Sequence, residues 1–240
     1  VGSEMCIRDR SSIKTKNESC MMDIQNKNRK LLKKNHVYDE TMEHDACGVG
    51  PVVSTEGLKS RKVVEYGIEA LKAVWHRGAI DADGKTGDGA GIHIEIPNDF
   101  FAEKIEITGH EHDNSDLCVG MIFLPRNDFG GQEQCRSIVE SELTKKNFNI
   151  YGWRQVPVDP SVLGEKAEQT RPEITQVLFT HNDKSIHVKD LERALYETRR
   201  KIEKEALRNQ LNNFYICSFS SKSIIYKGMF LAEALSDFYP

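Results

Sequence analysis

The stretch HDACGVG, residues 44–50, places a cysteine directly before a short and largely apolar run over residues 49–54, which reads as a strand. A cysteine at the mouth of a strand can present its sulfur at the edge of a sheet. The glycine that follows has no side chain, so a substrate could approach the backbone closely. Cys47 could equally be one more buried thiol that fills apolar space. Both readings remain open on this stretch alone.

The second informative stretch is WHRGAIDADGKTGDGAG, residues 75–91. Its dense glycine predicts a chain that turns tightly and repeatedly. A phosphate-binding loop is excluded by spacing, because the position of its first glycine is occupied by Ala79. It is also excluded by charge, because Asp81 and Asp83 would repel phosphate. A dinucleotide-binding pattern fails as well, since Ile92 stands where a third glycine is needed. The stretch is therefore either a structural turn between a helix and a strand or part of a pocket wall.

Hydrophobic periodicity predicts alternating helices and strands after residue 47. Val64, Ile68 and Leu71 recur at helical spacing, which predicts a helix over residues 59–76. Further helices are expected at residues 132–146 and 189–208, and strands at residues 91–96, 117–124, 151–156, 174–180, 214–219 and 223–226. Residues 117–124 are apolar at nearly every position, which favours an interior strand. Many strands interrupted by a few long helices predict an α+β sandwich.

Composition and charge exclude several classes of function. The formal net charge of −4 offers no concentrated basic face for nucleic acid. No apolar run approaches the roughly 18 residues of a membrane span, so no membrane partner is expected. The six cysteines are scattered without a Cys-x-x-Cys pair, which argues against a metal site and favours a reducing, cytoplasmic setting. The run HEHD at residues 110–113 has metal-binding residue types, but adjacent residues cannot readily converge on one ion, so an exposed loop is expected.

Taken together, residues 44–50 and 76–91 resemble the amino-terminal class II glutamine amidotransferase domain of the glutamate synthase large subunit. Later stretches resemble the same family, and the resemblance covers residues 47–240. They are YGWRQVP at 151–157, GEKA at 164–167 with TRPEI at 170–174, NFYICS at 213–218 and YKGMFLAE at 226–233.

The resemblance implies an Ntn-hydrolase-type, four-layer αββα sandwich, incomplete at the C-terminus of this chain. Residues 1–46 would be a disordered non-native leader plus a propeptide, and residues 47–240 the N-terminal part of the amidotransferase domain. Cys47 would then become the first residue, and its own α-amino group could serve as base for the thiol. The implied reaction releases ammonia from L-glutamine through a γ-glutamyl thioester. Arg77 would lie near the substrate, although an arginine that ties loops together is an equal reading.

In the full enzyme, the resemblance implies that ammonia converts 2-oxoglutarate to glutamate with FMN, an iron–sulfur cluster and electrons from a small subunit or ferredoxin. That equipment would belong to downstream synthase domains, and no cofactor is expected in this chain. The Asn-Gly pair that supplies the family's oxyanion hole is absent from this sequence, so residues 1–240 alone are predicted to be inactive. Pro51 stands where the family has a large apolar residue. Another class II amidotransferase and a non-catalytic module remain alternatives.

Overall fold

In the computed structural model, the apolar run Leu117–Leu124 forms strand β2, which lies between two partner strands and is buried on both faces by two apolar cores. β4 (Glu173–His181) and β5 (Tyr215–Ser220) pair with β2 in antiparallel orientation. β3 (Phe148–Gln155) pairs with the other edge of β4, which gives the order β3-β4-β2-β5. The interior position expected for residues 117–124 is confirmed.

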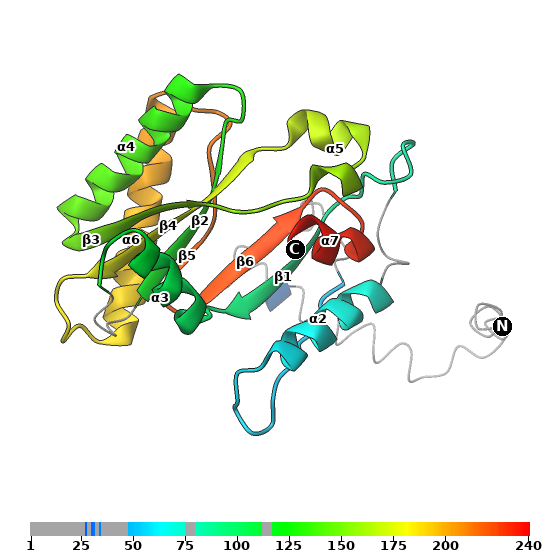
Figure 1. Cartoon of the computed structure of the whole chain (residues 1–240), viewed down its shortest axis with the longest axis horizontal. Coiled ribbons are helices and arrows are strands. Elements are labelled where there is room, and N and C mark those ends of the chain that lie inside the picture. Colours follow the sequence, from blue (N-terminus) through cyan, green and yellow to red (C-terminus); the bar gives the residue numbers. More distant parts are fainter. Residues whose placement is uncertain (1–26, 28–29, 32–33, 35–47, 75–79, 112–116) are drawn as a thin grey trace, which may run out of the picture. The chain divides into compact units, whose positions relative to one another are not determined.

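The structure describes residues 27, 30–31, 34, 48–74, 80–111 and 117–240. The chain divides into two units, Val1–Cys47 and Gly48–Pro240. All the helices and strands labelled in Figure 1 belong to the second unit.

A second, two-stranded antiparallel sheet is formed by β1 (Ala90–Glu95) and β6 (Ser223–Gly228), with Ile92 opposite Tyr226. Every other residue of β1 is exposed, which confirms the half-buried strand that the sequence alternation predicted. β6 follows β5 after Ser221 and Lys222 only, so the two sheets lie next to each other (Figure 1).

The two faces of β2 contribute to two separate apolar cores, because successive side chains of a strand point to opposite faces. Leu117, Val119 and Met121 join the core that also contains Ile224 of β6. Cys118, Ile122 and Leu124 join the core beneath the two long helices. These are α4 (Phe129–Lys145) and α6 (Val188–Arg208), which cover the outer face of the four-stranded sheet (Figure 1).

The remaining helices complete the sandwich. α2 (Arg61–Ala73) packs against β1, with no fully buried residue in the helix. The α+β class is confirmed. The layers follow in the order of helices α4 and α6, the four-stranded sheet, the two-stranded sheet and helix α2, which corresponds to the expected αββα arrangement. The shorter elements are α3 (Asn98–Ile107), η2 (Pro160–Val162), α5 (Glu165–Thr170), η3 (Ala232–Ala234) and α7 (Leu235–Phe238).

The strand predicted over residues 49–54 is wrong. Residues 48–60 contain no strand, and Val49 and Val53 are 88% and 80% exposed. A strand needs a ladder partner for its backbone groups, and no described residue supplies one here. Pro51 also lacks the amide donor that a ladder would use.

The long helices begin and end close to their predicted positions. α4 starts at Phe129 rather than at residue 132, because the Asp128 carboxylate accepts a hydrogen bond from the Gly131 amide at 2.9 Å and caps the helix. None of the helices in the described ranges combines the length and the apolar character that a membrane crossing requires.

Candidate functional site

Cys47 and Arg77, the two residues singled out from the sequence, lie outside the described residues. The described residues resume at Gly48 after the first and at Ile80 after the second. Gly48 is exposed, and Ile80 is 54% exposed at the start of the described part of the glycine-rich stretch.

Residues 80–87 form a tight hairpin turn that leads into β1. Ile80 and Gly87 pair as an isolated antiparallel bridge. Within it, the Asp81 amide donates to the Thr86 carbonyl at 2.9 Å, and the Gly84 amide donates to the Asp81 carbonyl at 3.0 Å. Gly84 has a φ of +70°, which side chains disfavour, so the turn needs glycine at this position. The tight turn expected from the glycine content is confirmed.

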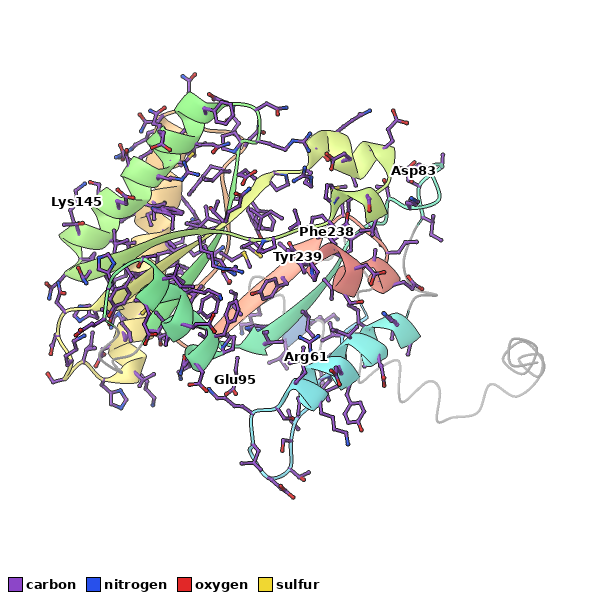
Figure 2. All side chains as sticks on the ribbon, in the orientation of Figure 1. Arg61, Asp83, Glu95, Lys145, Phe238 and Tyr239 are labelled. Atoms are coloured by element: carbon purple, nitrogen blue, oxygen red, sulfur yellow. The ribbon has the colours of Figure 1, made fainter. Side chains whose placement is uncertain are left out.

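The carboxylate of Asp83 organises this turn. It accepts hydrogen bonds from the Thr86 hydroxyl at 2.5 Å, from the Thr86 amide at 2.7 Å and from the Lys85 amide at 3.0 Å. These bonds favour the charged form, the Thr86 hydroxyl most of all, and they hold the pKa of Asp83 far below its usual range. Figure 2 shows Asp83 on the hairpin beside α5.

Thr86 joins the hairpin to α5. Its side chain is 2% exposed, and its hydroxyl oxygen accepts a hydrogen bond from the Ala167 amide at 3.3 Å. Lys166 adds an ion pair to Asp81, with 2.5 Å between Nζ and Oδ2. The Lys166 ammonium, through this hydrogen bond, lowers the pKa of Asp81. At Gly164 a β-carbon would come within 2.3 Å of Asp83 Oδ2 and 2.4 Å of Thr86 Oγ1, so the contact requires glycine.

A cleft of about 1200 Å³ opens beyond the hairpin, where the ends of the two sheets meet. Residues 88–91, the end of the glycine-rich stretch, form part of its wall. The ends of β2 and β6 and the starts of β4 and β5 supply much of the rest. Its interior is apolar at Phe123, Ile174 and Phe230, among others. The pocket-wall reading of the glycine-rich stretch is therefore confirmed for residues 88–91.

Charged side chains of both signs line this cleft, among them Lys227, Arg171 and Asp128. Glu168 pairs with two of the lining arginines. Arg126 Nη1 lies 2.6 Å from Glu168 Oε1, and Arg171 Nε lies 2.7 Å from Glu168 Oε2. The two guanidinium groups, Arg171 first, hold the pKa of Glu168 below its usual value. Lys227 donates to the Tyr215 hydroxyl at 2.7 Å and lies over the same ring. Such a cleft suits a small polar molecule that carries both positive and negative charge.

Thiol and metal chemistry are limited in the described part of the chain. Cys118, Cys135 and Cys217 are all buried and form no disulfide. Burial raises the pKa of the Cys135 and Cys217 thiols to about 11, which makes both poor nucleophiles. Among the described residues, no group of three or more His, Cys, Asp or Glu side chains could hold a metal ion. His110 and Glu111 are exposed, and the rest of that run lies outside the described residues.

Sequence reasoning missed the charged residues around the cleft and the role of Thr86. Arg126 and Glu168 are 42 positions apart, and Thr86 and Ala167 are 81 apart, so no local spacing indicates either contact. In the sequence, the stretches next to Glu168 and around Arg171 are indicated only by their resemblance to the family.

Comparison with known proteins agrees with this architecture. Residues 47–240 match the family described as class-II glutamine amidotransferases. The chain is 54% identical over 205 residues to the glutamate synthase [NADPH] large chain of Azospirillum brasilense. The aligned region covers 85% of this chain and 14% of that protein. It is 37% identical over 198 residues to ferredoxin-dependent glutamate synthase 2 of Synechocystis, covering 82% of this chain and 12% of that protein. The chain thus spans well under a fifth of the length of these relatives, and it belongs to the class-II glutamine amidotransferases.

Proposed function

We propose that this chain carries the nucleophile-bearing part of the amidotransferase domain of a glutamate synthase, which in the full-length enzyme performs the glutaminase half-reaction and releases ammonia from L-glutamine. One observation carries the proposal above the others: the amidotransferase match begins at Cys47, the residue expected to become the N-terminal nucleophile. The relatives of both kinds, NADPH and ferredoxin-dependent, are glutamate synthases.

In this proposal, residues 1–46 are a propeptide with any preceding leader, and their removal exposes the α-amino group of Cys47. That amine, whose ordinary pKa is about 7.7–8.0, takes the thiol proton. The sulfur attacks the side-chain amide carbon of glutamine, and the proton passes to the leaving nitrogen as ammonia departs. Water then hydrolyses the γ-glutamyl thioester, which yields glutamate and restores the thiol.

The described residues support a binding role for the cleft beside the glycine-rich stretch. Glutamine carries an ammonium and a carboxylate, and the cleft offers cations such as Lys227 together with carboxylates such as Asp88 and Asp128. Arg77, in the same stretch, would lie near the substrate. The buried thiols at Cys135 and Cys217 are poor competitors for the nucleophilic role.

The rest of the synthase reaction would occur elsewhere. We propose that ammonia passes to downstream synthase domains, where FMN supplies electrons for glutamate formation from 2-oxoglutarate. The iron–sulfur cluster would likewise lie in those downstream domains. Electrons would come from a small subunit or from ferredoxin, the two possibilities that the relatives' names suggest.

Two other readings remain distinct from this one. A different class II amidotransferase would deliver ammonia to another acceptor, but the relatives cited are glutamate synthases. A non-catalytic module would keep the scaffold without turnover, and it would retain residues 1–46 with Cys47 unreactive.

The test combines intact mass and N-terminal sequencing of the full-length gene product with a Cys47→Ser variant. We expect a mature chain that begins at Cys47 and a loss of glutamine-dependent ammonia release in the variant. Full glutaminase activity in pure Cys47→Ser protein would reject the mechanism. A mature chain that retains Ala46 would leave the thiol without its base and favour the non-catalytic reading.

A further inference from the structure

The hairpin at residues 80–87 is fixed from two sides by parts of the chain that are distant in sequence. On one side, the Thr86 hydroxyl bonds Asp83 and accepts from the Ala167 amide of α5. On the other side, Gly87 packs on the backbone of Phe230, where a β-carbon would meet the Phe230 carbonyl at 2.8 Å. The hairpin therefore has little freedom to move independently of α5 and of the segment after β6.

The wall of the cleft begins where this hairpin ends. Gly87 is followed directly by residues 88–91, which line the cleft, and Phe230 lines it too. A displacement of Thr86 would consequently be transmitted to the cleft wall through one intervening residue. The buried threonine is the point where hairpin, helix and wall meet.

The chemistry of Thr86 is more specific than packing requires. Valine has the same shape as threonine, so shape alone would not require a hydroxyl at this buried position. Threonine instead uses its hydroxyl twice, donating to Asp83 and accepting from Ala167. Removing it would leave the buried Ala167 amide without this acceptor and would take one of three hydrogen-bond donors from the Asp83 carboxylate, an arrangement that favours displacement of the loop.

We propose that Asp83 and Thr86 are positioning residues of the glutamine site: together with Gly164 they form a clamp that sets the place of the cleft wall at residues 88–91. The inference rests on the proposed function, since it concerns the same cleft. Neither residue is assigned a contact with substrate. They act through the backbone that they hold.

The experiment uses the full-length gene product and two independent ways of disturbing the clamp. Thr86→Val removes the hydroxyl, whereas Thr86→Ser keeps it. Gly164→Ala leaves the hairpin sequence intact but places a β-carbon within 2.4 Å of Thr86 Oγ1. Matched controls are Thr144→Val, at an exposed threonine of α4, and Gly130→Ala, where the added carbon meets nothing closer than 3.6 Å.

Two readouts are taken for each variant: kcat and KM for glutamine, and the rate of alkylation of Cys47 by two reagents. A diazoketone analogue of glutamine needs the formed site, whereas iodoacetamide needs only the reactive thiol. For Thr86→Val and Gly164→Ala we expect kcat/KM for glutamine and alkylation by the analogue to fall on the order of tenfold or more. The iodoacetamide rate should stay within about twofold, and Thr86→Ser and both controls should behave as wild type.

The inference is overturned if both disturbed variants keep wild-type kcat/KM, or if the two reagents slow equally, since that would indicate general damage to the fold. Should Thr86→Val fail to fold, Gly164→Ala decides alone by the same criteria. Failure of the proposed function would give a different result. In that case, neither alkylation of Cys47 in the wild-type protein nor its replacement by serine would reduce glutaminase activity.

Discussion

The side-chain amide of Gln176 accepts a hydrogen bond from the Arg154 guanidinium, with 2.8 Å between Oε1 and Nη1, at a position where Gln176 is fully buried. The same amide donates to the Tyr226 hydroxyl at 3.2 Å. Because Arg154 and Gln176 belong to the four-stranded sheet and Tyr226 to the two-stranded one, this polar chain joins the two sheets. The Arg154 guanidinium also lies over the ring of Phe100.

Replacing Gln176 should therefore destabilise the fold strongly. Gln176→Leu removes the hydrogen-bond acceptor of the partly buried Arg154 guanidinium and the donor to the Tyr226 hydroxyl. The loss of a buried hydrogen-bond partner costs roughly 1–3 kcal/mol, and more when the group left behind is charged. Chemical denaturation should show this loss in the free energy of unfolding. Gln155→Leu, at an exposed residue of the neighbouring strand, should change stability by less than about 0.5 kcal/mol. Equal effects at the two positions would contradict the cross-sheet role.

Gly120 of β2 is predicted to tolerate no side chain. A β-carbon there would lie 2.7 Å from both the Phe219 ring and the Val177 methyl group, in the core beneath α4 and α6. Gly120→Ala should reduce the free energy of unfolding by about 1–3 kcal/mol through overpacking. Thermal denaturation would measure it, with Gly130→Ala as the comparison. A Gly120→Ala protein as stable as wild type would show that the core repacks freely.

The carboxylate of Glu168 should make stability depend on acid pH. Its pKa is lowered in the folded state by Arg171 and Arg126, so its contribution is present above the ordinary value of 4.5 and is lost as the pH falls below it. Glu168→Gln should lower stability more at pH 7 than at pH 3. Urea titrations at both values test this, and Glu165→Gln on the same helix serves as control. A difference that does not depend on pH would reject the ion-pair explanation.

The thiols of Cys135 and Cys217 should resist alkylation in the folded chain. With both pKa values near 11, the thiolate fraction at pH 8 is about one in a thousand. A short iodoacetamide pulse followed by mass spectrometry should leave both unmodified, and denaturant should make both react. Since the folded values exceed the ordinary 9.0, the free energy of unfolding should also fall as the pH rises from 9 to 11. Rapid labelling at pH 8 without denaturant would contradict their burial.

The regular elements could largely be predicted because their patterns are local. The bounds of β2 agree with the apolar run at 117–124, and α6 agrees with the helical spacing that buries Leu191, Leu195 and Ile202. α3 is not among the predicted helices although it buries Phe101 and Ile105 four positions apart, because Pro97 also fits the end of the strand predicted over residues 91–96. A proline before the first helical residue also fits a helix start, since its missing amide is not needed there.

The failures concern contacts between distant parts of the chain. Residues 49–54 have the composition of a strand, but composition does not reveal whether a partner edge is present. The clamp formed by Asp83, Thr86 and Gly164 could not be predicted for a related reason. In the sequence, Thr86 is an ordinary polar residue of a glycine-rich turn. Only the approach of α5, about 80 positions later in the chain, gives its hydroxyl a second partner and buries it.

The space between Gly164 and the hairpin has a consequence for how related sequences can differ. A residue larger than glycine at position 164 fits only if Asp83 and Thr86 are replaced by smaller side chains or if the hairpin moves. These three positions should therefore change together or not at all across homologous chains. A lineage that acquired alanine at position 164 would be expected to carry a compensating change in the hairpin, inherited as a unit with it.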